Sequence, residues 1–191
     1  MDRYHLQRTE QGDWSIDYVV DTGTSFLQKP GSSPPGSQGF EYGVLPRRFE
    51  PIHPSLTQTP AYRKFLGRVA DCVYGMQPTS QMMMFVHHMH TFVTPEQEVA
   101  SNTPEGIHQD GADFILSALV VERHQVEGGE SRIYVDNGKT HIFSTQLDVG
   151  QGLIQPDHGT RLWHELTPLR LSPPTSQYGY RSVIGIDIHL L

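Results

Sequence analysis

The sequence predicts a mainly β protein of the sandwich or jelly-roll class. Segments with strand-like patterns recur from residue 81 to the C-terminus, after a single strong helix candidate. Turn-forming residues separate these segments, as in Asp136-Asn137-Gly138 and Asp157-His158-Gly159. Many short strands at regular spacing are typical of two packed antiparallel sheets.

The N-terminal region predicts two strands and a loop between them. Residues 14–20 alternate between apolar and polar side chains, which is the pattern of a half-buried strand. Residues 29–39 are rich in proline, glycine and serine and predict a flexible loop. Residues 40–49 predict a further strand. We therefore expect an N-terminal strand and a flexible loop within residues 1–39.

The segment from Thr59 to Tyr74 predicts a helix. Thr59 can cap the helix, Pro60 suits its first turn, and Gly75 is placed to end it. The apolar residues of the segment recur at helical spacing, so one face is expected to pack on a sheet. We expect the helix to have no chemistry of its own.

After residue 81 the pattern changes to strands. The first of them, Met82 to Val93, is apolar on both faces, as a strand inside a barrel or sandwich is. The sequence Glu127-Gly128-Gly129 predicts a tight turn. The further expected strands are Phe114 to Val121, Ser131 to Val135, His141 to Leu147, Gly152 to Gln155, Thr160 to His164 and Arg181 to His189. We expect one domain over residues 1–191, with a helix plus a jelly-roll core in residues 40–191.

The composition limits the classes of function. The 191-residue chain has a net charge of −7 and no Lys/Arg-rich run, so it does not favour binding to nucleic acid or to an anionic membrane. Its single cysteine, Cys72, excludes an intrachain disulfide framework and predicts a small buried residue on the helix. The N-terminus lacks the apolar core of a signal peptide, and no segment has the length of a membrane span. We therefore expect a cytoplasmic protein.

A metal-binding pattern lies between Pro104 and Gly111. His108 and Asp110 are two residues apart, so on an extended segment their side chains project to the same face. A second imidazole from a distant strand would complete two histidines and one carboxylate on one side of a metal. That set leaves the opposite positions open and is the ligand arrangement of non-haem Fe(II) oxygenases. The alternative interpretation is two polar residues at a turn.

Two histidines compete for the third ligand position. His164 lies 54 residues after Asp110, at the end of an expected strand. His158 lies in the sequence Asp157-His158-Gly159, which predicts a hairpin tip where a side chain is solvated. We therefore favour His164 as the third ligand.

A second group of histidines lies on the strand before the motif. His88 and His90 share a face of that strand, and with His87 they offer another source of metal ligands. No carboxylate is paired with them in the sequence. Hydrogen-bonded imidazoles in ordinary strand packing are therefore the favoured interpretation.

Arg181 lies near the start of the last expected strand, among apolar residues that alternate as if half buried. A guanidinium on a core strand needs an anionic partner, because an unpaired buried charge is very costly. The carboxylate of a ligand, gripped by two parallel hydrogen bonds, would meet that need. An internal Asp or Glu would meet it as well, and both interpretations stay open.

The order of these residues resembles that of the Fe(II)/2-oxoglutarate-dependent dioxygenases. The resemblance is carried by His108-X-Asp110, the distal His164 within Trp163 to Pro168, and Arg181 seventeen residues later, with Glu127 to Ser131 between them. It is greatest for the bacterial branch that hydroxylates free amino acids, the L-isoleucine 4-hydroxylase-like proteins. It covers about residues 40–190 and is most specific after residue 80.

The resemblance implies a double-stranded β-helix, a jelly-roll and cupin relative with one or more flanking helices. It implies catalytic Fe(II) held by His108, Asp110 and His164. It further implies that 2-oxoglutarate chelates this iron while its far carboxylate meets Arg181, and that O2 is the second co-substrate. The reaction implied is hydroxylation of a small molecule, with a free L-amino acid as the expected substrate, and release of succinate and CO2.

Two other functions compete with this expectation. A cupin-like metal isomerase or hydrolase would use the same three ligands without 2-oxoglutarate, but Arg181 after His164 argues against it. A non-catalytic iron or 2-oxoglutarate sensor is the second alternative, and the complete ligand set argues against it.

The strand before the motif departs from the family. Family members often have a basic residue there, whereas this chain reads His87-His88-Met89-His90, so a different end-group of the substrate or different contacts to it are expected.

Overall fold

The computed structural model describes residues 1–19, 52–103, 106–173 and 177–191. The chain is mainly β with few helices, as the sequence predicts, and its antiparallel sheets are those of a jelly-roll-like fold. The strand expected at residues 14–20 is present as β2, up to its last described residue. The loop expected at residues 29–39 and the strand expected at residues 40–49 lie outside the described residues.

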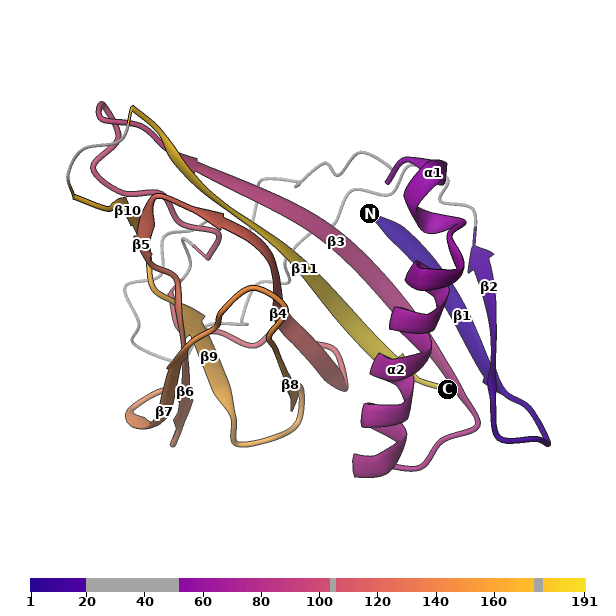
Figure 1. The fold of residues 1–191 in the computed structure, drawn as a ribbon. Helices are drawn as coiled ribbons and strands as arrows, with labels where there is room; N and C mark the ends of the chain where they lie inside the picture. Colours follow the sequence, from indigo (N-terminus) through magenta and orange to yellow (C-terminus); the bar gives the residue numbers. More distant parts are fainter. Residues whose placement is uncertain (20–51, 104–105, 174–176) are drawn as a thin grey trace.

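A six-stranded antiparallel sheet forms the larger layer of the molecule (Figure 1). In order across the sheet, its strands are β2 (Trp14–Val19), β1 (Asp2–Arg8), β3 (Gln81–Val93), β11 (Gly179–Leu190), β4 (Phe114–His124) and β8 (Gly152–Pro156). A smaller three-stranded sheet faces it, and a two-stranded ribbon lies at one end. These smaller pieces consist of β7 (Thr140–Gln146), β6 (Glu130–Val135) and β9 (Trp163–Leu166), and of β10 (Leu169–Leu171) with β5 (Val126–Gly128).

One face of the large sheet is covered by helix α2 (Pro60–Met76), which follows the short helix α1 (Pro54–Thr57) (Figure 1). Thr59 caps α2 as expected, since its hydroxyl accepts a hydrogen bond from the Tyr62 N–H at 3.2 Å. The helix continues past Gly75, because this glycine does not adopt the left-handed conformation of a glycine cap. No helix among the described residues is long and apolar enough to cross a membrane.

The expected burial of Cys72 is wrong, because its side chain is exposed. Helical spacing puts Cys72 outside the stripe of α2 that packs on the sheet. The buried residues of that stripe are Tyr62, Leu66, Val69, Ala70 and Val73.

Strand β3 divides its side chains between two environments, which explains why both of its faces are apolar. Met82, Met84 and Val86 are buried in the core beneath α2. His87 and Met89 point the other way and line a cavity between the sheets. The expectation of a strand enclosed on both sides is therefore confirmed.

Strand β11 lies at the centre of the large sheet and pairs with β3 in an unbroken antiparallel register. The pairs run from Gly179 opposite Val93 to Leu190 opposite Met82. On its other side β11 pairs with β4, which has an extra residue at two places. The second of these bulges includes Ser117, which lines the cavity. Bulges of this kind re-aim side chains beside functional sites.

The structure differs from the sequence expectations mainly at short strands. Residue pairing in β9 begins at Trp163 instead of Thr160, because Thr160 belongs to a turn in which its hydroxyl donates to the Asp157 carbonyl at 2.7 Å. The expected turn at residues 127–129 is in part strand β5, and Gly128 and Gly129 have φ values of 80° and 65° as the chain turns into β6. Strand β1 was not predicted, and neither were β5 and β10, since three-residue strands such as the latter two carry no readable periodicity.

We expect Leu66→Ala to lower the free energy of unfolding by about 2–5 kcal/mol, because the Leu66 side chain is fully buried between α2 and the sheet. Urea denaturation followed by circular dichroism measures the change. The matched control is Leu56→Ala on α1, where the leucine is 43% exposed and the expected change is within about 0.5 kcal/mol. Equal effects of the two substitutions would contradict the assigned core.

Candidate metal centre

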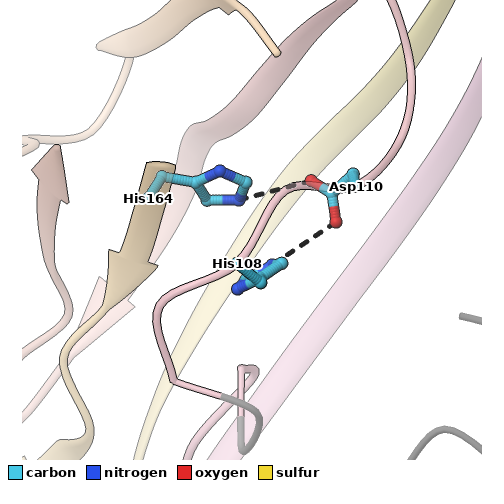
Figure 2. A group of neighbouring side chains, drawn as sticks. All are labelled: His108, Asp110 and His164. Carbon is cyan, nitrogen blue, oxygen red and sulfur yellow. Dashed lines mark ion pairs between the residues drawn. The ribbon is translucent and has the colours of Figure 1, made fainter. Parts of the chain in front are cut away.

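The chain brings His108, Asp110 and His164 together at one point between the two sheets (Figure 2). His108 and His164 are joined by their backbones. The His108 N–H donates to the His164 carbonyl at 2.8 Å, and the His164 N–H donates back to the His108 carbonyl at 3.0 Å. This bridge brings the two imidazole ring centres to 4.3 Å from each other. The loop that carries His108 is thereby fixed against β9.

Asp110 lies between the two imidazoles. His108 Nε2 is 3.4 Å from one carboxylate oxygen, and His164 Nε2 is 3.3 Å from the other (Figure 2). The three candidate ligand atoms all lie within 4.8 Å of one another, a spacing at which one metal ion could contact all of them. Both imidazoles are buried, whereas the Asp110 side chain is about a quarter exposed. Burial acts to raise the pKa of Asp110, but the neighbouring imidazoles hold that pKa well below its usual range.

The ring of His108 has a defined orientation. Its Nδ1 lies 2.7 Å from the carbonyl oxygen of Gly106, and a carbonyl can only accept a hydrogen bond. Nδ1 therefore donates to this carbonyl, and Nε2 is left as the nitrogen that a metal ion could bind. A histidine held in this way through its other nitrogen is the usual arrangement at a metal site. Gly106 has a φ of 73°, which turns its carbonyl toward the ring.

Asp157 lies next to His164, on the side of ring nitrogen Nδ1, and the sequence did not predict it as a site residue. Its side chain is fully buried, and one oxygen accepts a hydrogen bond from the Gly111 N–H at 2.8 Å. The other oxygen lies 3.7 Å from His164 Nδ1, close enough for an electrostatic contact. Burial, together with the charge of Asp110, raises the pKa of the Asp157 carboxyl. The only signal was its place before His158, in a sequence that predicts a turn.

Gln109 joins the metal motif to the turn that precedes β9. Its side-chain amide donates to the carbonyls of Leu162 at 2.7 Å and Asp157 at 3.0 Å. A side chain between two candidate ligands in the sequence thus points away from them and holds the strand that brings the third. Spacing alone gave no reason to single out Gln109.

The competing histidines lie elsewhere. His158 is exposed at its turn, as expected, and takes no part in the group of three. His88 contacts the Tyr62 hydroxyl at 3.2 Å on the helix side of β3, and His90 contacts the Ser182 hydroxyl on the same face. These two imidazoles are hydrogen-bonded within strand packing, as expected. His87 differs, because it pairs with a carboxylate that the sequence did not reveal, Asp187.

A cavity opens beside the three residues. By area most of its wall is apolar, but polar side chains also line it, among them Ser131, Arg132 and Glu165. The apolar lining comes from the large sheet and consists mainly of Met89, Leu116, Ala118, Leu153 and Val183. Such a lining excludes water around a reacting group and suits a small organic ligand.

Arg181 is buried in the large sheet, with only 1% of its surface exposed. None of its three guanidinium nitrogens has a hydrogen-bond partner among the described residues. Burial, and the nearby Arg123, lower the pKa of Arg181 to about 10. The internal salt bridge that was one interpretation of Arg181 is therefore not found in the described part of the chain.

The surroundings of Arg181 favour an anion from outside the chain. Arg123 lies opposite Arg181 on β4, so two cations occupy neighbouring positions. Gly129 leaves room for the Arg181 side chain, since a Cβ at Gly129 would lie 3.3 Å from Arg181 Cδ and closer still to Leu169. A buried cation of this kind is stable only when a ligand supplies the missing negative charge. Two imidazoles, a carboxylate and this arginine match the groups needed to hold Fe(II) and a dicarboxylate.

Comparison with solved structures shows the same fold in other proteins. A BsmA homologue from Methylobium petroleophilum PM1 matches with a TM-score of 0.71 and 20% identity, over 98% of this chain and 70% of that chain. IDO from Bacillus thuringiensis matches with a TM-score of 0.72 and 15% identity, over 99% of this chain and 73% of that chain. The Fe(II)/α-ketoglutarate-dependent dioxygenase TqaL matches with a TM-score of 0.60 and 16% identity, over 76% and 59% of the two chains.

At these identities the structural similarity supports the fold, and the sequence itself supports the family. No curated protein is similar enough in sequence to match this chain. The model of one family, described as 2OG-Fe dioxygenase, matches residues 37–187, which is well over half of the chain. The match includes His108, Asp110, His164 and Arg181. The chain therefore belongs to the 2OG-Fe dioxygenase family and is a dioxygenase that uses Fe(II), 2-oxoglutarate and O2.

Proposed function

We propose that this dioxygenase hydroxylates a free L-amino acid, with His108, Asp110 and His164 as its iron ligands and Arg181 as its contact to 2-oxoglutarate. The observation that carries the proposal is the buried guanidinium of Arg181, which has no hydrogen-bond partner among the described residues, in the same fold as an intact group of two imidazoles and a carboxylate. The resemblance of residues 104–111, 127–131 and 163–168 to the L-isoleucine 4-hydroxylase-like branch supports the amino-acid substrate.

The three proposed ligands could hold an iron ion together, since their candidate ligand atoms lie within 4.8 Å of one another. His108 and His164 would each offer Nε2, and Asp110 would offer one carboxylate oxygen. Bound Fe(II) supplies the oxidative chemistry, in which O2 and 2-oxoglutarate give succinate and CO2 while one oxygen atom enters a C–H bond of the substrate. The Gly106 carbonyl orients the His108 ring through its Nδ1, and the Asp157 carboxylate lies 3.7 Å from Nδ1 of His164.

The proposed role of Arg181 is to receive the far carboxylate of 2-oxoglutarate. A guanidinium offers two parallel N–H groups to a carboxylate, and the pair is strong in a site that excludes water. The charge of the ligand would also remove the cost of a buried, unpaired cation. Arg181 is thus proposed as a residue that selects a co-substrate with a negative charge at its far end.

The cavity suits a substrate of metabolite size. Its apolar wall can hold an alkyl or thioether side chain against Met89, Leu116 and Val183. Fixing such a chain restricts which C–H bond lies near the proposed iron position, and this positioning is the main contribution that a protein makes to cofactor chemistry.

The test of the proposed function is succinate formation from 2-oxoglutarate with Fe(II), ascorbate and O2, across a panel of free L-amino acids. We expect succinate to rise strongly with one or a few aliphatic or thioether amino acids, and the same samples to contain the hydroxylated amino acid by mass spectrometry. Asp110→Ala is the negative control. It should abolish turnover while the protein remains folded, because the metal loses its only carboxylate ligand in the proposed set.

Retained turnover in Asp110→Ala would show that Asp110 is not a ligand. Succinate that never rises above a substrate-independent background with any amino acid would reject the amino-acid substrate, and the search would move to other metabolites. A complete lack of succinate from iron-loaded protein would reject the catalytic assignment and favour a sensor of iron or 2-oxoglutarate.

We expect Arg181→Met to weaken 2-oxoglutarate binding by at least about thirtyfold, because the carboxylate loses a buried charge partner. The same substitution should leave thermal stability unchanged or higher, since it removes an unpaired buried charge at similar volume. Anaerobic titration of the Fe(II)-loaded protein with 2-oxoglutarate, followed by absorption of the chelate, gives the affinity. An unchanged affinity would mean that another residue holds the co-substrate.

We expect Asp157→Asn to lower Fe(II) affinity about tenfold to a hundredfold, because His164 would lose the negative charge behind Nδ1. The measurement is a competition titration against a fluorescent iron chelator. The matched control is His158→Gln, at the next residue, where the side chain is exposed and Fe(II) affinity should stay the same. A loss of affinity in His158→Gln but not in Asp157→Asn would reverse the assignment of the third ligand.

A further inference from the structure

A buried histidine–aspartate pair in the cavity wall has no part in the proposed iron site. His87 on β3 and Asp187 on β11 contact each other through Nε2 and Oδ2 at 2.9 Å, and both side chains are almost fully buried. One hundred residues separate them in the sequence. Both residues line the cavity. The exposure that Asp187 retains therefore faces the space where a substrate would lie.

Strand β11 places Arg181 and Asp187 on one face of the large sheet. Arg181, Val183, Gly185 and Asp187 alternate along the strand, so they share the face that is turned away from α2. Six residues of extended chain separate Arg181 from Asp187, a distance of about 20 Å. If the 2-oxoglutarate carboxylate meets Arg181, the cavity wall near Asp187 remains for the primary substrate.

The cavity wall lacks a side chain beside His87 and Asp187. Gly185 lies opposite His87 in the register of β3 and β11 and presents no side chain to the cavity. A Cβ at this position would lie 3.1 Å from Met89 Cε and 3.9 Å from His87 Cδ2. Apolar residues of the lining include Leu116, Leu153 and Val183. A carboxylate beside such residues offers a ligand a strong polar contact next to a surface that can hold an apolar side chain.

The other acids of the cavity wall are already engaged. Asp110 lies between two imidazoles, and Glu165 lies 3.6 Å from the Arg132 guanidinium. Asp187 differs, because it contacts an imidazole, which can donate an N–H without carrying a positive charge. A purely structural contact between β3 and β11 would be met as well by two apolar side chains, so a buried ionisable pair in a binding cavity calls for a ligand.

We propose that Asp187, oriented by His87, accepts hydrogen bonds from the protonated amine of the primary substrate. The proposal rests on the proposed function, since it places the substrate in the cavity beside the iron ligands. Asp187 would then be a binding residue that selects amines over neutral or acidic compounds of the same shape. His87 would be a positioning residue, because it touches Asp187 and keeps one carboxylate oxygen directed into the cavity.

The test measures binding to the protein loaded anaerobically with Fe(II) and 2-oxoglutarate. Absorption of the iron chelate first shows that this complex has formed. Calorimetry then compares L-leucine, L-isoleucine and L-methionine with their des-amino counterparts, 4-methylpentanoate, 3-methylpentanoate and 4-(methylthio)butanoate. We expect at least one amino acid to bind about tenfold or more tightly than its counterpart, because a site built to bind an N–H group rejects the analogue that lacks it.

The variants report on the preference for the amine and not on stability alone. Asp187→Asn should bring the ratio of the two dissociation constants close to one, and Asp187→Glu should restore part of it. His87→Gln should reduce the ratio by less than Asp187→Asn, since the carboxylate charge is kept. The matched control is His88→Gln, one residue along β3, which faces α2 and should leave the ratio unchanged. Asp187→Ser replaces the Asn variant if that variant does not fold.

The outcomes separate this proposal from the one on which it rests. A full amine preference in Asp187→Asn overturns the role of Asp187. Chelate absorption without any amine preference in the unsubstituted protein overturns the amine-binding assignment, while the proposed cofactor site stands. The absence of chelate absorption in the unsubstituted protein overturns the proposed cofactor site, and the inference about Asp187 with it.

Discussion

The antiparallel pairing of β11 with β3 is the constraint on which both the core and the site depend. These strands are central in the large sheet and remain in register over their full paired length. Because side chains alternate, the pairing sorts one set, such as Met84 and Ile186, into the core under α2. The other set contains Arg181 and Asp187 and faces the smaller sheet. One interaction thus builds the hydrophobic layer and distributes the charged groups of the cavity.

A second constraint acts on the loop that carries the metal motif. That loop has no extended pairing of its own, yet its backbone exchanges two hydrogen bonds with His164. Gln109 and Gly111 add contacts to the turn before β9. The three candidate ligands are therefore brought together by interactions that do not require a metal. A site assembled in this way loses little conformational freedom when an ion binds, which favours a defined geometry over an adaptable one.

Local patterns predicted the long elements well, because periodicity over many residues reports which face is buried. β3, β11 and the Thr59 cap of α2 are examples. The pairing of His108 with Asp110, and the preference for His164 over His158, could also be predicted from the sequence. The partners of Asp157 and His87 could not, since each pair depends on a long-range contact with no local signature. Three-residue strands such as β5 were missed because they are too short to show a periodicity.

The alternation of β3 also limits how the binding cavity of this protein can change in evolution. His87 and His88 are neighbours in the chain but face the cavity and α2 respectively. A one-residue insertion between Gln81 and His87 would exchange the two faces, so that core methionines entered the cavity and His87 was driven into the core. New specificities are therefore accessible by substitution on this strand, whereas changes in length must be confined to the loops. The side chains of β3 can change, but the number of residues in the strand cannot change without moving side chains from one face to the other.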